Sequence, residues 1–212
     1  MALIDLNSGN QSDHIATAAA ALKDGYVIVA PLENSYALIA DAFFHDAVRA
    51  LHVLRGDALG ISAQVLISSA AAIDGIAREV SDEVRVLMKN FWPGLLSLNL
   101  KPQRGLNWDL GDGQELDSFS VRVPAAEFIS QVAKAHGPLA VASAAHVGKS
   151  AISDPSQLNF NEIEVAAIFS SGPLAQGPAS TVVACDGDTP RIVRIGAISV
   201  EQITAIAPNI SA

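Results

Sequence analysis

The stretch that decides the fold is Gly25-Tyr-Val-Ile-Val-Ala-Pro31-Leu-Glu-Asn-Ser-Tyr36-Ala-Leu38. It contains one short apolar run, at residues 26–30, and the start of a second, at residues 36–40; polar residues separate the two. Apolar runs of this length are typical of buried strands, and Pro31 closes the first because proline cannot donate to a sheet ladder. The stretch therefore predicts two successive buried strands.

Helical and strand-like patterns alternate on both sides of this stretch. Before it, Ser12 is expected to cap a helix that carries Ile15 and Leu22 and ends at Gly25; after it, apolar residues between 47 and 54 recur at helical spacing. Further strands are expected at residues 64–68, 96–100, 119–123, 139–142, 165–169, 181–184 and 191–194. Further helices are expected at 71–77, at 82–89, from Pro124 to 135, and after a capping box at 199–202.

The pattern favours one α/β (α+β) domain over residues 1–212. No internal repeat, low-complexity tract or linker divides the chain, and its length suits a single core. Helices are interspersed irregularly among strands, and the strands at 96–100 and 119–123 alternate as half-exposed strands do. These features favour helices packed on a twisted mixed sheet over a regular doubly wound sheet.

The charge balance and the apolar pattern exclude several kinds of partner. The chain carries 13 Lys+Arg against 22 Asp+Glu, for a formal net charge of −9. Duplex nucleic acid is held by clustered cations, so this balance argues against duplex RNA as a partner. No apolar window approaches a membrane span and no signal-peptide run is found, so a cytoplasmic location without membrane association is expected. The single cysteine, Cys185, excludes an internal disulfide and fits that location.

The common short motifs of catalytic and metal sites are missing from the sequence. It has no G-x-G-x-x-G, Walker, G-x-S-x-G or H-E-x-x-H pattern, and its five histidines lack metal-ligand spacing. No metal site is therefore expected, and no catalytic residue is assigned. Cys185 has no nearby basic residue, which predicts an inert packing thiol.

Polar residues do gather where strands are predicted to end. Glu33 and Asn34 follow one strand, Ser143 follows another, Ser180 precedes a third and Arg194 ends a fourth. Ligands of open α/β sheets collect in crevices at such edges. Each residue alone is more often a cap, a turn former or a solvated side chain than a ligand-binding group.

Seven short segments in order along the chain carry a more specific signal. They are Pro31-Leu-Glu-Asn-Ser-Tyr36-Ala-Leu38, Leu54-Arg55-Gly-Asp57, Trp92-Pro93-Gly94-Leu-Leu-Ser97, Val121-Arg122-Val-Pro124, Ala142-Ser143-Ala144, Ser180-Thr181-Val-Val183 and Arg194-Ile-Gly196. In this order they resemble the threonylcarbamoyl-AMP synthase family, the YrdC-type domain, over residues 12–200. The family pattern at these places is P-T-[DE]-T-x-Y-G-L, K-x-R, W-P-G-P-x-T, V-R-x-P, S-A-N-x-S-G, S-T-[VI]-V-D and R-x-G.

The resemblance implies a twisted sheet flanked by helices around a large, positively charged concave cavity. It implies a nucleotidyltransferase that condenses ATP, L-threonine and bicarbonate into threonylcarbamoyl-AMP and pyrophosphate, for the modification of tRNA adenosine 37. Mg²⁺ would accompany ATP as cofactor. This chemistry needs cations for the phosphates and hydrogen-bond donors for the threonine carboxylate and hydroxyl.

The same resemblance assigns the substrate- and nucleotide-binding positions to Asn34, Tyr36, Arg55, Arg122, Ser143, Ser180 and Arg194. Arg55 stands where the family has lysine, which keeps the charge but changes its shape. Asp57 stands where the family has arginine, which reverses a charge that would face phosphate, unless Asp57 points into solvent.

Three further ligand positions depart from the family pattern. Asn34 replaces a threonine, Ala37 replaces the glycine of Y-G-L, and Ala145 replaces the asparagine of S-A-N. Structural positions such as Trp92 and Pro124 are kept. The chain is therefore expected to be a divergent member that binds ATP more weakly than a typical member of the family.

The sequence leaves three interpretations open. The chain is a working threonylcarbamoyl-AMP synthase with an altered pocket, or a paralog that binds a nucleotide or another small anion without this reaction. The third interpretation is an unrelated α/β binding or scaffold protein. The sequence does not decide whether the chain catalyses the reaction, which ligand it binds, or what its oligomeric state is.

Overall fold

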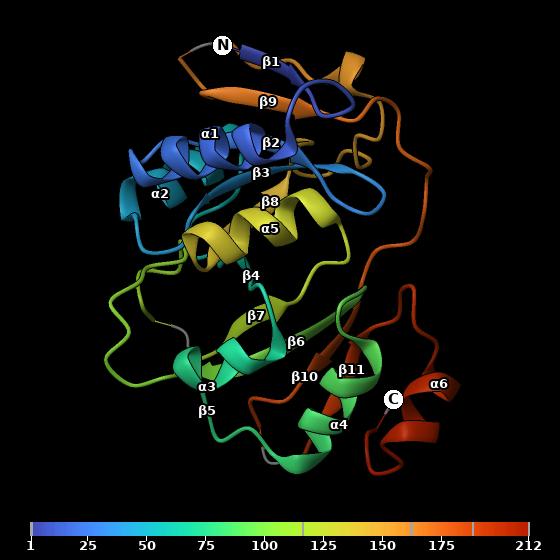
Figure 1. The fold of residues 1–212 in the computed structure, drawn as a ribbon. Helices are drawn as coiled ribbons and strands as arrows, with labels where there is room; N and C mark the ends of the chain where they lie inside the picture. Colours follow the sequence, from blue (N-terminus) through green and yellow to red (C-terminus); the bar gives the residue numbers. More distant parts are fainter. Residues whose placement is uncertain (1, 116, 162, 188, 212) are drawn as a thin grey trace.

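The strands form one mixed sheet in a computed structural model that describes residues 2–115, 117–161, 163–187 and 189–211. The strands are β1 Ala2–Asp5, β2 Ile28–Pro31, β3 Tyr36–Asp41, β4 Gln64–Leu66, β5 Ala77–Arg78, β6 Leu96–Pro102, β7 Phe119–Arg122, β8 Leu139–Ser143, β9 Ala167–Ser170, β10 Thr181–Ala184 and β11 Arg191–Arg194. Their spatial order is β1-β9-β2-β3-β8-β4-β7-β6-β10-β11, with β5 beside β6 (Figure 1).

The two strands predicted from residues 25–38 lie inside this sheet as an antiparallel pair. Ile28 lies opposite Ile39 and Pro31 opposite Tyr36. Alternate residues of β2 enter different cores, Ile28 one and Val29 the other, so both faces of the sheet are covered. Parallel pairs also occur, among them β4 with β7 and β6 with β10, which confirms the mixed sheet.

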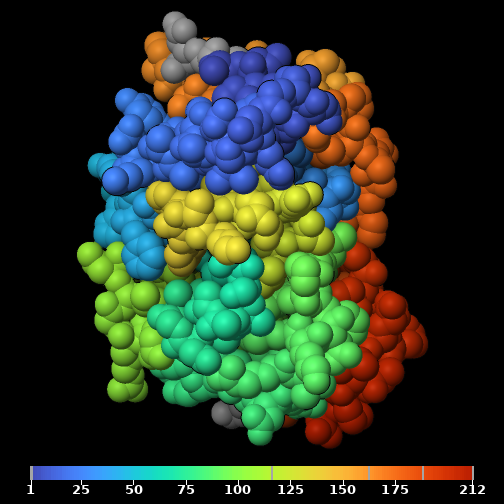
Figure 2. Space-filling view, viewed as in Figure 1, coloured from blue at the N-terminus to red at the C-terminus, as the bar shows by residue number. Residues whose placement is uncertain are grey.

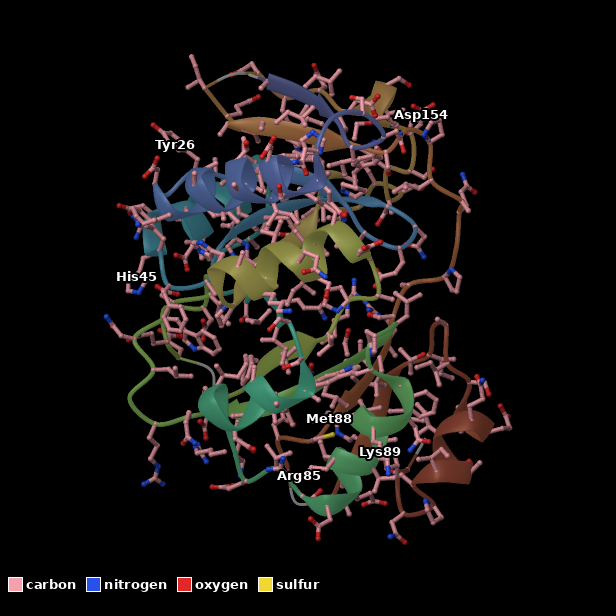
Figure 3. The ribbon with its side chains drawn as sticks, viewed as in Figure 1. Tyr26, His45, Arg85, Met88, Lys89 and Asp154 are labelled. Atoms are coloured by element: carbon pink, nitrogen blue, oxygen red, sulfur yellow. The ribbon has the colours of Figure 1, made fainter. Side chains whose placement is uncertain are left out.

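Helices cover both faces. They are α1 Gln11–Lys23, α2 His45–Arg55, α3 Ile73–Ile76, α4 Asp82–Phe91, α5 Glu127–His136 and α6 Val200–Ile206, with short 3-10 turns at Ala70–Ala72 and Pro155–Gln157. α1 and α5 lie side by side over β2, β3 and β8 and share one core with them (Figure 1). The other core takes residues from α2, α3, α4 and α6, including Met88 of α4 (Figure 3).

The described N-terminal and C-terminal segments lie at opposite ends of the molecule (Figure 1). β1 pairs in parallel with β9, so the N-terminal segment lies beside residues 167–170, whereas the C-terminal segment lies near α4 (Figure 2). The sequence did not predict β1, because its residues are mostly exposed and its pairing partner is far along the chain. No described helix has the length and apolar character needed to cross a membrane.

Three predicted helix boundaries are wrong. Asn10, rather than Ser12, caps α1, and its side chain accepts the Ser12 N–H. The helix expected from Pro124 begins at Glu127, because the preceding residues stay extended while the Ala125 N–H donates to Glu33. The helix expected at 71–77 ends at Ile76, and the next two residues pair with β6 instead.

Several other predicted boundaries agree, although the strand expected at 64–68 ends at Leu66 and the one expected at 165–169 begins at Ala167. β10 and β11 have the bounds expected, and the capping box of Ser199 with Gln202 precedes α6. Ser81 caps α4 as expected. The single-domain α/β fold with a mixed sheet is confirmed.

Candidate active site

A cavity of about 410 Å³ opens where several strands end. Its wall combines the β2–β3 turn, the C-terminal end of α2, residues 61–64, the end of β8, residues 177–182 and Arg194. The volume lies within the usual range for small-ligand sites. Segments that are far apart in sequence therefore meet at one edge of the sheet, as the strand-end argument predicted.

The structure brings together six of the seven predicted site residues. The cavity is lined by Asn34, Arg55, Arg122, Ser143, Ser180 and Arg194. Tyr36 is the exception, because its side chain is fully buried and the residue is absent from the lining. The Tyr36 hydroxyl donates to the Gly172 carbonyl at 2.7 Å and accepts the Ser171 N–H at 3.2 Å. Tyr36 thus fixes the start of the segment that leads to Ser180, while its expected contact with a ligand stays a prediction.

Arg122 is buried and paired with a carboxylate. Its two terminal nitrogens donate to the two oxygens of Glu33 at 2.6 and 2.9 Å, and NH1 also lies 3.3 Å from the Gly94 carbonyl. The Trp-Pro-Gly segment therefore positions a backbone acceptor for this arginine. A bidentate pair with the side chain 4% exposed is a structural arrangement, and it leaves little of the guanidinium for a ligand.

The environment of Glu33 favours its charged form. Burial alone raises the pKa of this carboxyl group, but hydrogen bonds from Arg122 and Ala125 and the Arg122 charge outweigh burial. The pKa of Glu33 therefore lies below its usual range. The sequence pattern placed Glu33 at a strand end, but it did not reveal the partner of Glu33, which lies 89 residues further along the chain.

Arg194 is arranged differently. Its Nε donates to the Ser180 carbonyl at 3.1 Å and its NH2 to the Ser180 hydroxyl at 2.9 Å. Both acceptors are neutral, and within the described ranges no carboxylate pairs with this exposed guanidinium. Its positive charge therefore remains available to an anion in the cavity.

Close backbone packing holds the segment around Ser180 against the segment around Arg194. A Cβ added at Gly196 would lie 2.2 Å from the Ala179 carbonyl oxygen, so only glycine fits. The Thr181 hydroxyl accepts the N–H groups of Gly196 and Ile198, each at 2.9 Å. The turn after β11 is thus fixed against β10, and Arg194 is held over Ser180.

A neutral network, missed from sequence, continues from Ser180 across the cavity floor. The Ser97 hydroxyl donates to Ser180 at 2.9 Å, and Gln64 Nε2 donates to Ser97 at 2.7 Å and to Ser120 at 3.1 Å. Ser97 is fully buried. The position of Ser97 in the Trp92–Ser97 segment was the sequence signal that could have identified it as a site residue. No pattern near Gln64 indicated a role beyond that of a strand residue.

The C-terminal end of α2 supplies a second charged cluster. Asp57 Oδ1 lies 3.2 Å from Arg55 Nε, and Asp57 Oδ2 lies 2.8 Å from His52 Nδ1. The Asp57 side chain is 5% exposed, so the alternative that it points into solvent is wrong. The Arg55 Nε–H does not point at Asp57 well enough to form a hydrogen bond, so this contact is an ion pair alone.

The turn after β8 packs against the same helix end. The Val147 N–H donates to the Arg55 carbonyl at 3.0 Å, which brings residues 143–148 beside α2. The Ser143 hydroxyl lies in the cavity wall and accepts the Ala145 N–H at 3.2 Å. Ala145 itself is buried and outside the lining. Across the cavity, Asn34 Nδ2 donates to the Pro178 carbonyl at 2.8 Å.

The acidic side chains of the cavity are already engaged by the protein. The two carboxylates, Glu33 and Asp57, are each paired with cations of the wall. The described residues hold no cluster of three or more histidine, cysteine or acidic side chains that fits a metal ion. Elsewhere in the chain, burial raises the pKa of the Cys185 thiol to about 12, which fits the inert thiol predicted from sequence.

Comparison with other proteins identifies the family. The Sua5/YciO/YrdC family model, described as "Telomere recombination", matches residues 20–196. A protein of Mycobacterium leprae (strain TN), provisionally named threonylcarbamoyl-AMP synthase, is 37% identical over 193 residues, which are 91% of this chain and 87% of the relative. The threonylcarbamoyl-AMP synthase of Bacillus subtilis (strain 168) is 31% identical over 196 residues, 91% of this chain and 56% of the relative.

Solved structures agree with this assignment. Pyrococcus abyssi Sua5 complexed with L-threonine matches with a TM-score of 0.89 at 25% identity, covering 100% of this chain and 62% of the Sua5 chain. Escherichia coli YciO matches with a TM-score of 0.82 at 25% identity, covering 95% of this chain and 98% of YciO. The resemblance predicted from the seven segments is thereby confirmed, and the chain belongs to the Sua5/YciO/YrdC family.

Proposed function

We propose that the chain is a threonylcarbamoyl-AMP synthase whose cavity binds Mg·ATP, L-threonine and bicarbonate. The observation that carries the proposal is the convergence of Arg55, Ser143, Ser180 and Arg194 on one cavity, from four separate segments of the family pattern. The relatives named threonylcarbamoyl-AMP synthase and the threonine complex of Sua5 support the choice of substrates. A cytoplasmic location and a role in tRNA modification are part of the same proposal.

The reaction joins the amino group of threonine to the carbon of bicarbonate with loss of water. An oxygen of the resulting carbamate then attacks the α-phosphorus of ATP, and pyrophosphate leaves with the electron pair of the broken P–O bond. Arg194 and Arg55 neutralise charge on the phosphates as pyrophosphate departs, and the hydroxyls of Ser180 and Ser143 donate hydrogen bonds. Mg²⁺ would be held by the phosphates of ATP and would offset part of their charge, because both cavity carboxylates are already paired.

One observation favours a second candidate, a paralog that binds a nucleotide or small anion without this reaction. Arg122 and Arg55 each pair with a carboxylate, which leaves Arg194 as the cavity arginine without one in the described part of the chain. Pyrophosphate release separates the candidates. A synthase releases pyrophosphate from ATP only when threonine and bicarbonate are both present, whereas a binder shows calorimetric binding of Mg·ATP without release.

A further inference from the structure

Asp57 occupies a position where the family pattern has arginine, yet it does not stand as an isolated negative charge. The left-handed Gly56 turns the chain back at the end of α2, and the Asp57 N–H donates to the His52 carbonyl at 3.0 Å. This turn brings the carboxylate between two side chains of the last helical turn, His52 and Arg55. Cations are also favoured at a helix C-terminus, because the helix dipole is negative there.

Each ring nitrogen of His52 lies beside a hydrogen-bond acceptor. Nδ1 lies 2.8 Å from the Asp57 carboxylate, and Nε2 lies 2.8 Å from the Leu110 carbonyl oxygen. A carboxylate and a carbonyl only accept hydrogen bonds, so both bonds form together only when both ring nitrogens carry a proton. Gly111 leaves room for this contact, since a Cβ there would lie 2.3 Å from Nε2.

We propose that Asp57 is a positioning residue: it holds Arg55 and the imidazolium of His52 as a cationic edge of the cavity, and so supports anion binding instead of opposing it. The inference rests on the proposed binding of Mg·ATP in this cavity. With both ring nitrogens of His52 protonated, the cluster of His52, Arg55 and Asp57 carries two positive charges and one negative charge, so it remains a net cation. A side chain that is already fixed loses less entropy when the ligand binds.

Other charged groups face this cluster from a neighbouring cavity of about 510 Å³, which shares His52 and Asp57 in its wall. They are His45 and Arg49 on α2 and Asp109, Asp112 and Glu115 in the loop before β7. The close ion pairs of His52 and Arg55 are nevertheless with Asp57. Removal of the Asp57 charge therefore acts first on these two cations.

The substitution Asp57→Asn gives opposite results under two explanations. If Asp57 simply repels phosphate, the substitution raises the affinity for Mg·ATP. If Asp57 positions the two cations, the variant lets His52 lose one proton and frees Arg55, so the local charge is unchanged but its placement is lost. We then expect the Kd for Mg·ATP, measured by calorimetry, to rise roughly 3- to 10-fold, the effect of one ordinary hydrogen bond.

Nitrogen-15 NMR of the histidine rings gives a readout that does not depend on the ligand. In the wild-type chain at pH 7, His52 should show a proton on both nitrogens, and in the Asp57→Asn variant a proton on one. Asp46→Asn is the matched control: it removes the same charge from the same helix, but its side chain is 83% exposed. This control should change neither the His52 spectrum nor the Kd.

Tighter Mg·ATP binding by Asp57→Asn, or a singly protonated His52 in the wild-type chain, would overturn the positioning role. The wild-type spectrum tests the protonation of His52, and with it the positioning role of Asp57, even if the variant does not fold. A wild-type chain that fails to bind Mg·ATP is a different outcome. It would remove the proposed function and the anion role together, whereas binding with a singly protonated His52 removes the positioning role alone.

Discussion

Arg122 and Arg194 each end a strand and line the same cavity, yet their surroundings give them different roles. Arg122 is 4% exposed and bidentate to Glu33, whereas Arg194 is exposed and bonds only to the neutral oxygens of Ser180 among the described residues. The same residue type at equivalent strand ends is therefore a structural cation in one place and a ligand-facing cation in the other. What separates the two is the charge of the partner.

The largest expected effect is on stability and comes from Arg122→Met. The substitution leaves Glu33 as a largely buried carboxylate without its cation, so we expect a loss of about 3 kcal/mol in the free energy of unfolding. Urea denaturation followed by circular dichroism measures the loss. Arg49→Met is the matched control, because Arg49 is 76% exposed and its pair with Asp46 spans 3.7 Å.

The control should change stability by no more than about 0.5 kcal/mol. The double variant Glu33→Gln with Arg122→Met should be more stable than Arg122→Met alone, because it removes the unpaired charge. If Arg122→Met is as stable as Arg49→Met, Arg122 is not a structural cation and the contrast with Arg194 fails.

The second prediction concerns the other arginine. Arg194→Gln removes the cavity cation that has no carboxylate partner in the described ranges, so we expect Mg·ATP to bind roughly 10- to 100-fold more weakly, the effect of a charge-assisted hydrogen bond. Folding stability should stay close to that of the wild type. Calorimetric titration measures the affinity. Arg191→Gln, on the same strand but outside the cavity lining, should bind normally; equal losses in both variants would indicate a general charge effect instead.

The sequence predicted the motif residues of this site but not which of them would be free to bind. Six of the predicted residues line one cavity. They could be predicted because short apolar runs and strand-end polar groups are local signals. The Glu33–Arg122 pair spans 89 residues, and the His52–Leu110 contact spans 58, so no local pattern could reveal them. The strand β1 was missed for the same reason, since its only signal is its pairing with β9.

The third prediction uses pH to test the buried pair. The pKa of Glu33 is lower in the folded chain than its usual value, so its stabilising contribution is complete above the unfolded pKa of about 4.3. The contribution is lost as the pH falls through the folded pKa. We therefore expect the stability difference between wild type and Glu33→Gln to shrink between pH 6 and pH 3, as measured by urea denaturation. A difference that is constant over this range would contradict the depressed pKa.

The smallest effect is expected from the neutral network beneath Arg194. Ser97→Ala removes a fully buried hydroxyl that links Gln64 to Ser180, and we expect a loss of about 1 kcal/mol in the free energy of unfolding. Because Ser180 also accepts from Arg194, Mg·ATP affinity should fall by a few-fold, far less than in Arg194→Gln. Thermal unfolding and calorimetry measure the two effects.

Ser8→Ala is the control for this last variant, because Ser8 is exposed and its hydroxyl donates to the nearby Asp5 carbonyl at 3.1 Å. It should change neither quantity. If Ser97→Ala weakens Mg·ATP binding as much as Arg194→Gln, the charge of Arg194 is not what distinguishes this end of the cavity. The neutral hydroxyls that hold the guanidinium in place would then matter as much as the charge, because a misplaced cation would bind no better than an absent one.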